Sequence, residues 1–181
     1  MSEISSDFNS FQPNRAEAVK FLDGFGCTPP TTRFRALPER TGCQIRPQSL
    51  AGTQFDQLFE LNRQGCGIFF MVNPATGDKN ADVTGIRAVF ADLDGAPLES
   101  VTGNALQPHV IVETSPGRYQ VYWKVLDCPL ERFTPLQKAI AKRFGGDPAV
   151  CNLARIMRLP GFYHLKAEPF LTRIVTIGEM S

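Results

Sequence analysis

The sequence predicts an α+β fold in which a mostly antiparallel or mixed sheet is backed by helices. Short alternating segments lie between turn-rich stretches, and two of them are joined by a tight turn typical of a β-hairpin. Helical segments fall among these strands without the regular alternation of a doubly wound parallel sheet. The chain has 181 residues and no internal repeat, as expected of a single well-buried domain.

The first half of the chain is expected to contribute two helices and two strands. Asn14 is positioned to cap a helix that begins at Arg15 and stops at Gly24. An amphipathic helix is expected from Thr53 to Arg63, closed by Gly65. The strands are expected at TTRFRAL (31–37) and GIFFMVN (67–73).

The second half is expected to form most of the sheet. The strand IRAVFADLD (86–94) ends in carboxylates, and a hairpin and a last strand follow it at HVIVETS (109–115), RYQVYWKV (118–125) and FLTRIVTI (170–177). A helix is expected over residues 130–144, broken at Gly145-Gly146. A second short helix is expected over residues 148–155, with Pro148 in its first turn.

Composition and charge exclude some classes of protein. Five cysteines without a C-x-x-C pair argue against a disulfide framework and a zinc ribbon. No apolar run approaches the ~18–20 residues that span a bilayer, so we expect a cytoplasmic protein with no membrane partner. The net charge is only +1, but basic residues gather in the last third, which suits either a polyanion or a solvated face. They are Arg143, Arg155, Arg158, Lys166 and Arg173.

Asp92 and Asp94 are candidate metal ligands. Residues two apart on a strand lie on the same face, so both carboxylates are expected to point the same way. Two such charges repel unless a cation lies between them, and Mg²⁺ and Mn²⁺ prefer carboxylate oxygens. The alternative is a turn, because Asp94-Gly95 is a common dipeptide at the end of a strand.

The hairpin TSPGRYQVYW (114–123) places Ser115, Arg118 and Gln120 near one strand end, where they can hold a phosphate or a sugar. An ordinary turn above a buried aromatic face would explain the same residues equally well. Both interpretations remain open at this point.

A third candidate segment covers residues 145–166. Asp147 follows the Gly-Gly pair and could simply cap a helix. Arg155 and Arg158 would share a helical face if that helix persists, and Lys166 follows the next turn. Such a basic cluster behind a carboxylate suits a triphosphate, although a solvent-facing basic edge is the alternative.

Together, these segments resemble the archaeo-eukaryotic primase superfamily, in particular the RepB-like primase-polymerases of plasmids, phages and prophages. The resemblance extends from Gly65 to Lys166 and includes, in order, GIFFMVN, VFADLD, ETSPGRYQVYW, GGDPAV and RIMRLPGFYHLK. It implies an RRM-like catalytic unit over residues 85–181, an N-terminal α/β unit over residues 1–84 and an active site between them. It also implies a longer replication protein, with a helical or helicase region or a helicase partner.

The family's three motifs map onto five positions of this sequence. The first motif is an acidic pair, which corresponds to Asp92 and Asp94. The second is a hairpin whose serine corresponds to Ser115, but Gln120 stands where the family has a histidine that contacts the nucleotide's phosphates. The third is a single aspartate, which corresponds to Asp147.

The resemblance implies two-metal nucleotidyl transfer that makes and extends primers on single-stranded DNA from nucleoside triphosphates. The three aspartates would be catalytic and would hold two Mg²⁺ or Mn²⁺ ions. Because a glutamine carries no charge, part of the phosphate binding is expected to shift to Arg118, Arg158 and Lys166. Arg155 is expected to reach the nucleotide or the template.

Two other classes of protein stay open. A haloacid-dehalogenase-like phosphatase would use Asp92 as the nucleophile and Asp94 as the acid/base, but the motif lies in mid-chain and Ala96 replaces that family's threonine. A non-catalytic module for single-stranded nucleic acid would use the hairpin aromatics and the basic tail. A rolling-circle nicking enzyme is disfavoured, because His109 and His164 are the only histidines and form no His-x-His pair. Both histidines are therefore expected to be structural.

Overall fold

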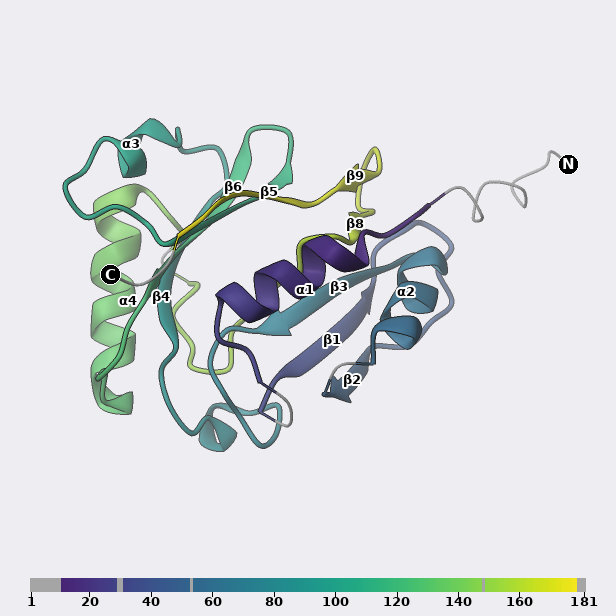
Figure 1. Ribbon diagram of the computed structural model, residues 1–181, viewed down its shortest axis with the longest axis horizontal. Helices are drawn as coiled ribbons and strands as arrows, with labels where there is room; N and C mark the ends of the chain where they lie inside the picture. The colour runs from purple at the N-terminus through teal and green to yellow at the C-terminus, as the bar shows by residue number, and fades with distance from the viewer. Residues whose placement is uncertain (1–10, 29–30, 53, 148, 179–181) are drawn as a thin grey trace, which may run out of the picture.

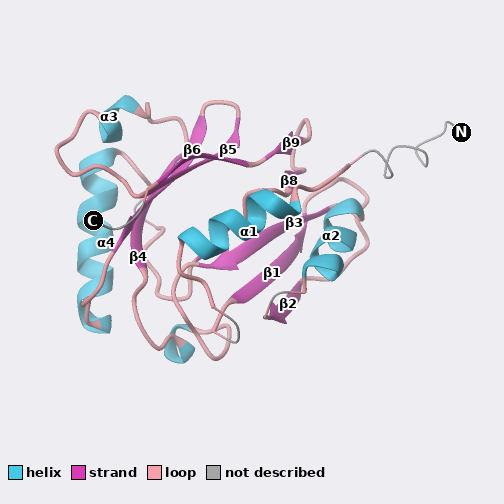
Figure 2. Ribbon diagram, in the orientation of Figure 1, coloured by secondary structure: helices cyan, strands magenta, loops and turns pink. Residues whose placement is uncertain are grey.

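The computed structural model describes residues 11–28, 31–52, 54–147 and 149–178, and it has the predicted α+β fold (Figure 1). The described strands form two four-stranded sheets and one two-stranded sheet, and the pairings within them are antiparallel. Helices flank both larger sheets, and one helix lies between them (Figure 2). None of the helices in these ranges is both long and apolar enough to cross a bilayer.

The first sheet has the strand order β2-β1-β3-β7. Its strands are β1 (Arg33–Pro38), β2 (Gln48–Ala51), β3 (Cys66–Met71) and β7 (Ile156–Arg158). Burial alternates along β1, where Phe34 and Ala36 point into the core. The edge strand β7 comes from the last third of the chain and pairs with β3, with Arg158 opposite Phe69.

The second sheet has the strand order β10-β5-β6-β4. Its strands are β4 (Ala88–Leu93), β5 (Val110–Ser115), β6 (Arg118–Lys124) and β10 (Arg173–Ile177). The short strands β8 (Tyr163–His164) and β9 (Phe170–Leu171) form a separate ribbon. The predicted hairpin is β5–β6, with Gly117 in the left-handed region at φ 72°.

Helices cover both sheets (Figure 1). They are α1 (Arg15–Gly24), α2 (Phe55–Arg63), α3 (Glu99–Thr102) and α4 (Leu130–Phe144), and a 3₁₀ turn, η2, covers Asn80–Asp82. α2 packs on β3, α4 packs on β4, and α1 contacts β10. The predicted cap of α1 is confirmed, because the side chain of Asn14 accepts a hydrogen bond from the backbone N–H of Glu17.

An aromatic cluster joins the two sheets. Phe21 of α1 and Phe25, directly after that helix, contact Phe70 of the first sheet and Tyr122 of the second, with ring centroids 4.9–6.1 Å apart. All four side chains are buried. Because aromatic burial dominates core energetics, this cluster stabilises both sheets as one core.

The predicted short helix over residues 148–155 is wrong over its described part. Pro148, like Thr53 at the start of the second predicted helix, lies outside the described residues. Residues 149–155 form turns instead, because their backbone groups bond to distant segments. The N–H of Ala154 donates to Asn80 Oδ1, the carbonyl of Leu153 accepts from Asn73 Nδ2, and the carbonyl of Arg155 accepts from the N–H of Val72. These tertiary bonds replace the helical ones.

Candidate functional site

The first predicted motif lies at the end of β4, at the edge of the second sheet. Asp92 is half-buried and faces Gln120 across the β4–β6 pairing. Asp94 is exposed in the bend that follows, where its carboxylate forms an ion pair with Arg118. The first and second motifs therefore meet twice, where Asp92 lies opposite Gln120 and where Asp94 pairs with Arg118.

The third motif reaches the same place through the Gly-Gly turn. Gly145 ends α4 in the left-handed region, at φ 70°. Gly146 then packs against β4, and a Cβ atom on it would lie 3.5 Å from the carbonyl oxygen of Asp92. Asp147 follows directly, is exposed, and accepts a hydrogen bond at Oδ1 from the N–H of Ala149, 2.8 Å away.

The electrostatics of Asp92 show that the three aspartates share one local field. Burial raises the pKa of Asp92 above its usual value. The positive charges of Arg155 and Arg158 lower the pKa of Asp92. The negative charges of Asp94 and Asp147 raise it further. A buried carboxylate beside two others favours a cation in their midst.

The donor set fits a hard divalent cation in kind, because all three groups are carboxylates. Among the described residues, however, no three His, Cys, Asp or Glu side chains are grouped closely enough to enclose an ion. Asp94 is instead paired with Arg118, and Asp147 accepts a hydrogen bond from the backbone of Ala149. Metal binding requires at least Asp94 to exchange its partner.

Gln120 connects the two sheets. It is buried, and its Oε1 accepts hydrogen bonds from Tyr122 Oη at 3.2 Å and from the backbone N–H of Arg158 at 3.1 Å. The side-chain oxygen is thus engaged in the protein itself. If a nucleotide were bound beside Asp92, the amide nitrogen of Gln120 is the atom that would contact it.

Arg158 is held by Glu39, a residue outside every motif that sequence analysis singled out. Its guanidinium forms a bidentate ion pair with Glu39, at 2.6 and 3.2 Å, and lies over the ring of Phe69. The exposed fractions of the two side chains are 8% for Arg158 and 1% for Glu39. Glu39 also accepts from the N–H of Leu165. The predicted phosphate clamp is therefore neutralised and fixed by a buried carboxylate.

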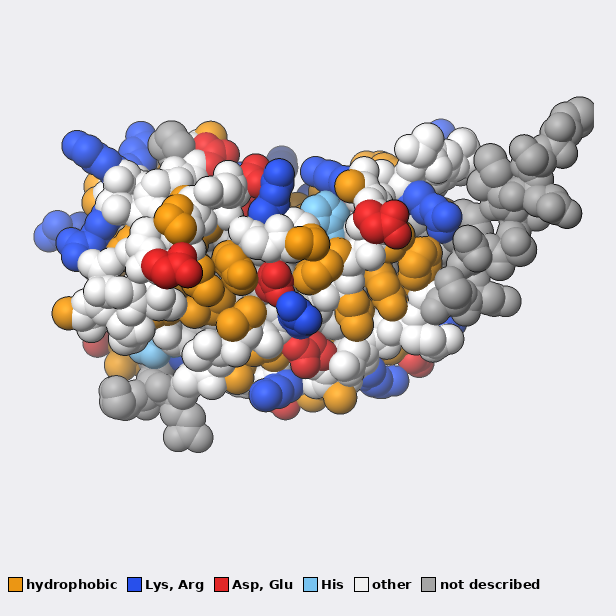
Figure 3. Space-filling view, turned by 90° about the horizontal axis from the view of Figure 1, so that it is seen from above, with side chains coloured by type: hydrophobic (Ala, Val, Ile, Leu, Met, Phe, Trp, Pro, Cys, Tyr) orange, Lys and Arg blue, Asp and Glu red, His pale blue; other side chains and the backbone are white. Residues whose placement is uncertain are grey.

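A cavity of about 400 Å³ lies between the hairpin turn and the turn that joins β8 to β9. Ser115, Arg118 and Lys166 line it, as does His164. Three predicted nucleotide-binding residues are thus brought together, beside the Arg118–Asp94 ion pair. Figure 3 shows, near the middle of the face seen from above, basic (blue) and acidic (red) side chains close to a histidine (pale blue).

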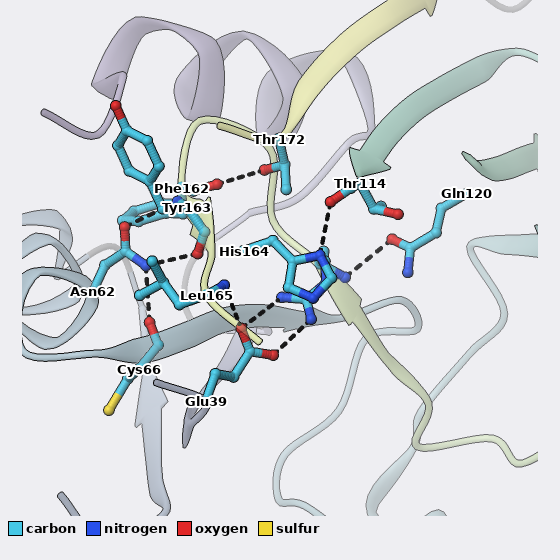
Figure 4. A network of polar contacts seen from close by, with 11 residues as sticks. Glu39, Asn62, Cys66, Thr114, Gln120, Phe162, Tyr163, His164, Leu165 and Thr172 are labelled. Atoms are coloured by element: carbon cyan, nitrogen blue, oxygen red, sulfur yellow. Dashed lines mark hydrogen bonds and ion pairs between the residues drawn. The ribbon is translucent and has the colours of Figure 1, made fainter. Parts of the chain in front are cut away.

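His164 was expected to be structural, yet it lines this cavity. Its strand β8 is fixed from below by Asn62 of α2, whose side chain bonds both the N–H and the carbonyl of Tyr163 at 3.0 and 2.9 Å (Figure 4). His109, by contrast, accepts a hydrogen bond from the N–H of Lys124 and serves the sheet. Spacing along the chain could not separate the two histidines, because the pairing of β8 is a long-range contact.

Arg155 lies half-buried in the loop before β7 and does not share a helical face with Arg158. Its charge acts on Asp92. Its buried Nε finds no hydrogen-bond partner in the described part of the chain. Arg155 is therefore close enough to Asp92 for its charge to lower the pKa of that carboxyl.

Comparison with known proteins shows which family the segment that carries this site is similar to. The RepB DNA-primase N-terminal domain matches residues 88–173, which include all the predicted site residues. Mobilization protein A of Escherichia coli is 28% identical over 110 residues, which are 60% of this chain and 14% of that protein. The chain thus corresponds to a small part of that relative.

Solved structures share the fold. The AEP domain of the cyanophage S-2L primase-polymerase has a TM-score of 0.80 and 23% identity, over 93% of this chain and 94% of that one. Primase RepB′ has a TM-score of 0.68 and 20% identity, over 92% and 57%. The catalytic domain of RepB′ in complex with initiator DNA has a TM-score of 0.66 and 19% identity, over 92% and 86%.

The domain matches and the shared fold confirm the resemblance found in the sequence. Together they support a RepB-like primase domain, with the family match covering residues 88–173 of this chain.

Proposed function

We propose that this chain is a nucleotidyltransferase that makes and extends primers on a single-stranded DNA template. The observation that supports it best is the meeting of three motifs at the end of β4. Asp94 and Asp147 both act on the half-buried Asp92, and the cavity beside them is lined by Arg118 and Lys166. The family match and the RepB′ complex with initiator DNA support DNA as the template.

Each side chain has a role in this proposal. Asp92, Asp94 and Asp147 would hold two Mg²⁺ or Mn²⁺ ions, which when bound lower the pKa of the attacking 3′-hydroxyl and neutralise the triphosphate. Arg118 would leave Asp94 and turn toward the phosphates. The protein otherwise contributes positioning and fixed charge.

The remaining predicted residues divide into contacts and supports. Lys166 and Ser115 would contact the triphosphate directly, since both line the cavity. Arg155 would face the nucleotide or the template. Arg158 and Gln120 would shape the floor of the site, because their side chains are buried and engaged.

A primer-synthesis assay tests the proposal. The protein is incubated with single-stranded DNA, labelled nucleotides and either Mg²⁺ or Mn²⁺, and the products are separated on a gel. Asp92→Asn should lower synthesis ~10³-fold or more, because it removes a metal ligand. The control is Asp56→Asn, which changes an exposed carboxylate on α2 and should leave synthesis unchanged. Full synthesis by Asp92→Asn would refute the proposal.

Two measurements separate the alternatives. A phosphatase would hydrolyse a simple aryl phosphate through a trappable phosphoaspartate at Asp92. A binding module would bind nucleotides with the same affinity with and without Mn²⁺, whereas the proposed enzyme should bind them more tightly with it.

A further inference from the structure

The two nitrogens of the His164 ring have different surroundings. Nδ1 lies 2.9 Å from the carbonyl oxygen of Thr114 (Figure 4). A carbonyl oxygen only accepts, so Nδ1 carries a hydrogen. In the neutral ring, Nε2 then holds a lone pair and cannot donate. Nε2 is buried and has no hydrogen-bond partner among the described residues.

Charged groups surround this ring from several elements. Arg158 of β7 and Glu39, in the loop after β1, lie beneath it, and Lys166 follows it in the chain. Arg118 and Glu168 also line the cavity. Burial lowers the pKa of His164, and the charge of Arg158 lowers it further, while the Thr114 carbonyl and Glu39 oppose the shift. The ring is therefore neutral at pH 7 when the cavity is empty.

A triphosphate in the cavity would reverse this balance. It brings several negative charges and many acceptor oxygens, but no donor to satisfy the Nε2 lone pair. A neutral Nε2 would repel a phosphate oxygen, whereas a protonated one would donate a charge-assisted hydrogen bond to it. Because Nε2 is buried, contact requires a local displacement of the residues that cover it.

We propose that His164 is a proton-coupled phosphate ligand. It is neutral in the empty site, and when a nucleoside triphosphate binds it takes one proton from solvent onto Nε2 and donates it in a hydrogen bond to a phosphate oxygen. The proton returns to solvent when the phosphate leaves. This inference rests on the proposed function, because it takes the triphosphate to be the occupant of the cavity.

Calorimetry with a non-hydrolysable nucleoside triphosphate and Mg²⁺ tests the inference. Titrations in two buffers of different ionisation enthalpy give the number of protons taken up per nucleotide bound. The wild type should take up close to one proton more than His164→Gln at pH 7. Its dissociation constant should rise with pH, approaching tenfold per pH unit between the pKa of the free ring and that of the bound ring.

Two controls make the result specific. His109→Gln changes the other histidine, which lies outside the cavity, and should keep the wild-type proton uptake. Protonation of the nucleotide itself contributes equally to all three proteins and therefore cancels. The ¹⁵N shifts of the His164 ring in the wild type provide a measurement without a variant, and should change from the Nδ1–H tautomer to the doubly protonated ring on binding.

The outcomes separate this inference from the proposed function. If the nucleotide binds and primers are made, but His164→Gln and the wild type take up the same number of protons, the role of His164 is wrong and the proposed function stands. A ring that stays neutral in the nucleotide complex would have the same meaning. If no nucleotide binds to the wild type, both proposals fail.

Discussion

Asp92 is the residue on which the account of the site depends, and its surroundings favour function over stability. Burial and two neighbouring carboxylates oppose its charge, so the folded protein binds a proton at Asp92 more readily than the unfolded chain does. Its contribution to stability is therefore lost as the pH rises from the unfolded pKa through the raised folded pKa. At neutral pH the ionised Asp92 destabilises the protein when no cation is bound.

We predict that Asp92→Asn stabilises the metal-free protein at pH 7, by about 1 kcal/mol, as is typical when strain at a functional site is removed. The free energy of urea unfolding measures the effect. The difference should disappear at a pH below the unfolded pKa, where both side chains are uncharged. Adding Mn²⁺ should stabilise the wild type and not the variant. A less stable variant at pH 7 would contradict this explanation of the raised pKa.

The pair of Glu39 and Arg158 is the second critical contact between residues. Removing one partner leaves the other charge buried, which costs about 3–5 kcal/mol. We predict this loss for Glu39→Gln, measured by urea unfolding. Asp56→Asn breaks the exposed pair of Asp56 with Arg15 and should cost less than about 1 kcal/mol. Similar losses for both variants would show that burial does not control the strength of these pairs.

Among the helices and strands, the ribbon of β8 and β9 depends on a close contact between the turn before β8 and the start of α1. The turn before β8 contains Gly161, at φ 88°, whose carbonyl accepts from the N–H of Asn14 at the start of α1. A Cβ atom there would overlap the carbonyl oxygen of Asn14 and lie 3.0 Å from the N–H of Ala18. The start of α1 and the strand that carries His164 are therefore held together by a residue without a side chain.

Gly161→Ala should destabilise the protein by roughly 3 kcal/mol or more, because backbone atoms must move in addition to the left-handed strain. Gly26 is the matched control, since its φ is 70° and an added Cβ meets nothing within 4 Å. Gly26→Ala should cost only about 1 kcal/mol. Thermal unfolding of the two variants measures the difference. Equal losses of stability would mean that the close contact of Gly161 with the start of α1 does not contribute to stability.

Local periodicity was enough to predict most elements. The helices at 15–24, 55–63 and 130–144 and the hairpin of β5 and β6 follow from patterns that lie within each segment. β7 and the loop before it did not follow, because their backbone partners lie in β3 and at Val72 directly after it, more than 80 residues earlier in the chain. The predicted last strand was divided for a similar reason, since Thr172 bonds to Gly161 and Phe162 between β9 and β10.

The candidate site also contains residues that local patterns could predict and residues that depend on long-range contacts. Motif residues at the ends of strands, such as Asp92 and Ser115, were accessible to sequence analysis because turns and alternation place them. Glu39 was not, because its burial depends on Gly67, where a Cβ atom would overlap the carboxylate. The position of His164 beside the cavity was not accessible either, because its environment is defined by Thr114 and Arg158 from other strands.

The whole protein should unfold in a single transition, because the cluster of Phe21, Phe25, Phe70 and Tyr122 joins the two sheets. Trp123, the only tryptophan, reports on the second sheet, and far-ultraviolet circular dichroism reports on all helices and strands. We predict that the two probes give coincident urea transitions. Tyr122→Leu should move both to lower urea together, and separate midpoints would show that the sheets are independent units.

The central claim is that Asp92, Asp94 and Asp147 converge on divalent cations beside a triphosphate. Anomalous diffraction from crystals grown with Mn²⁺ and a non-hydrolysable nucleoside triphosphate tests it directly. We predict manganese peaks in contact with Asp92 and Asp94 and next to Asp147, with Arg118 released from Asp94 and the triphosphate in the cavity beside Lys166. Manganese bound elsewhere, with these three carboxylates free of it, would contradict the account.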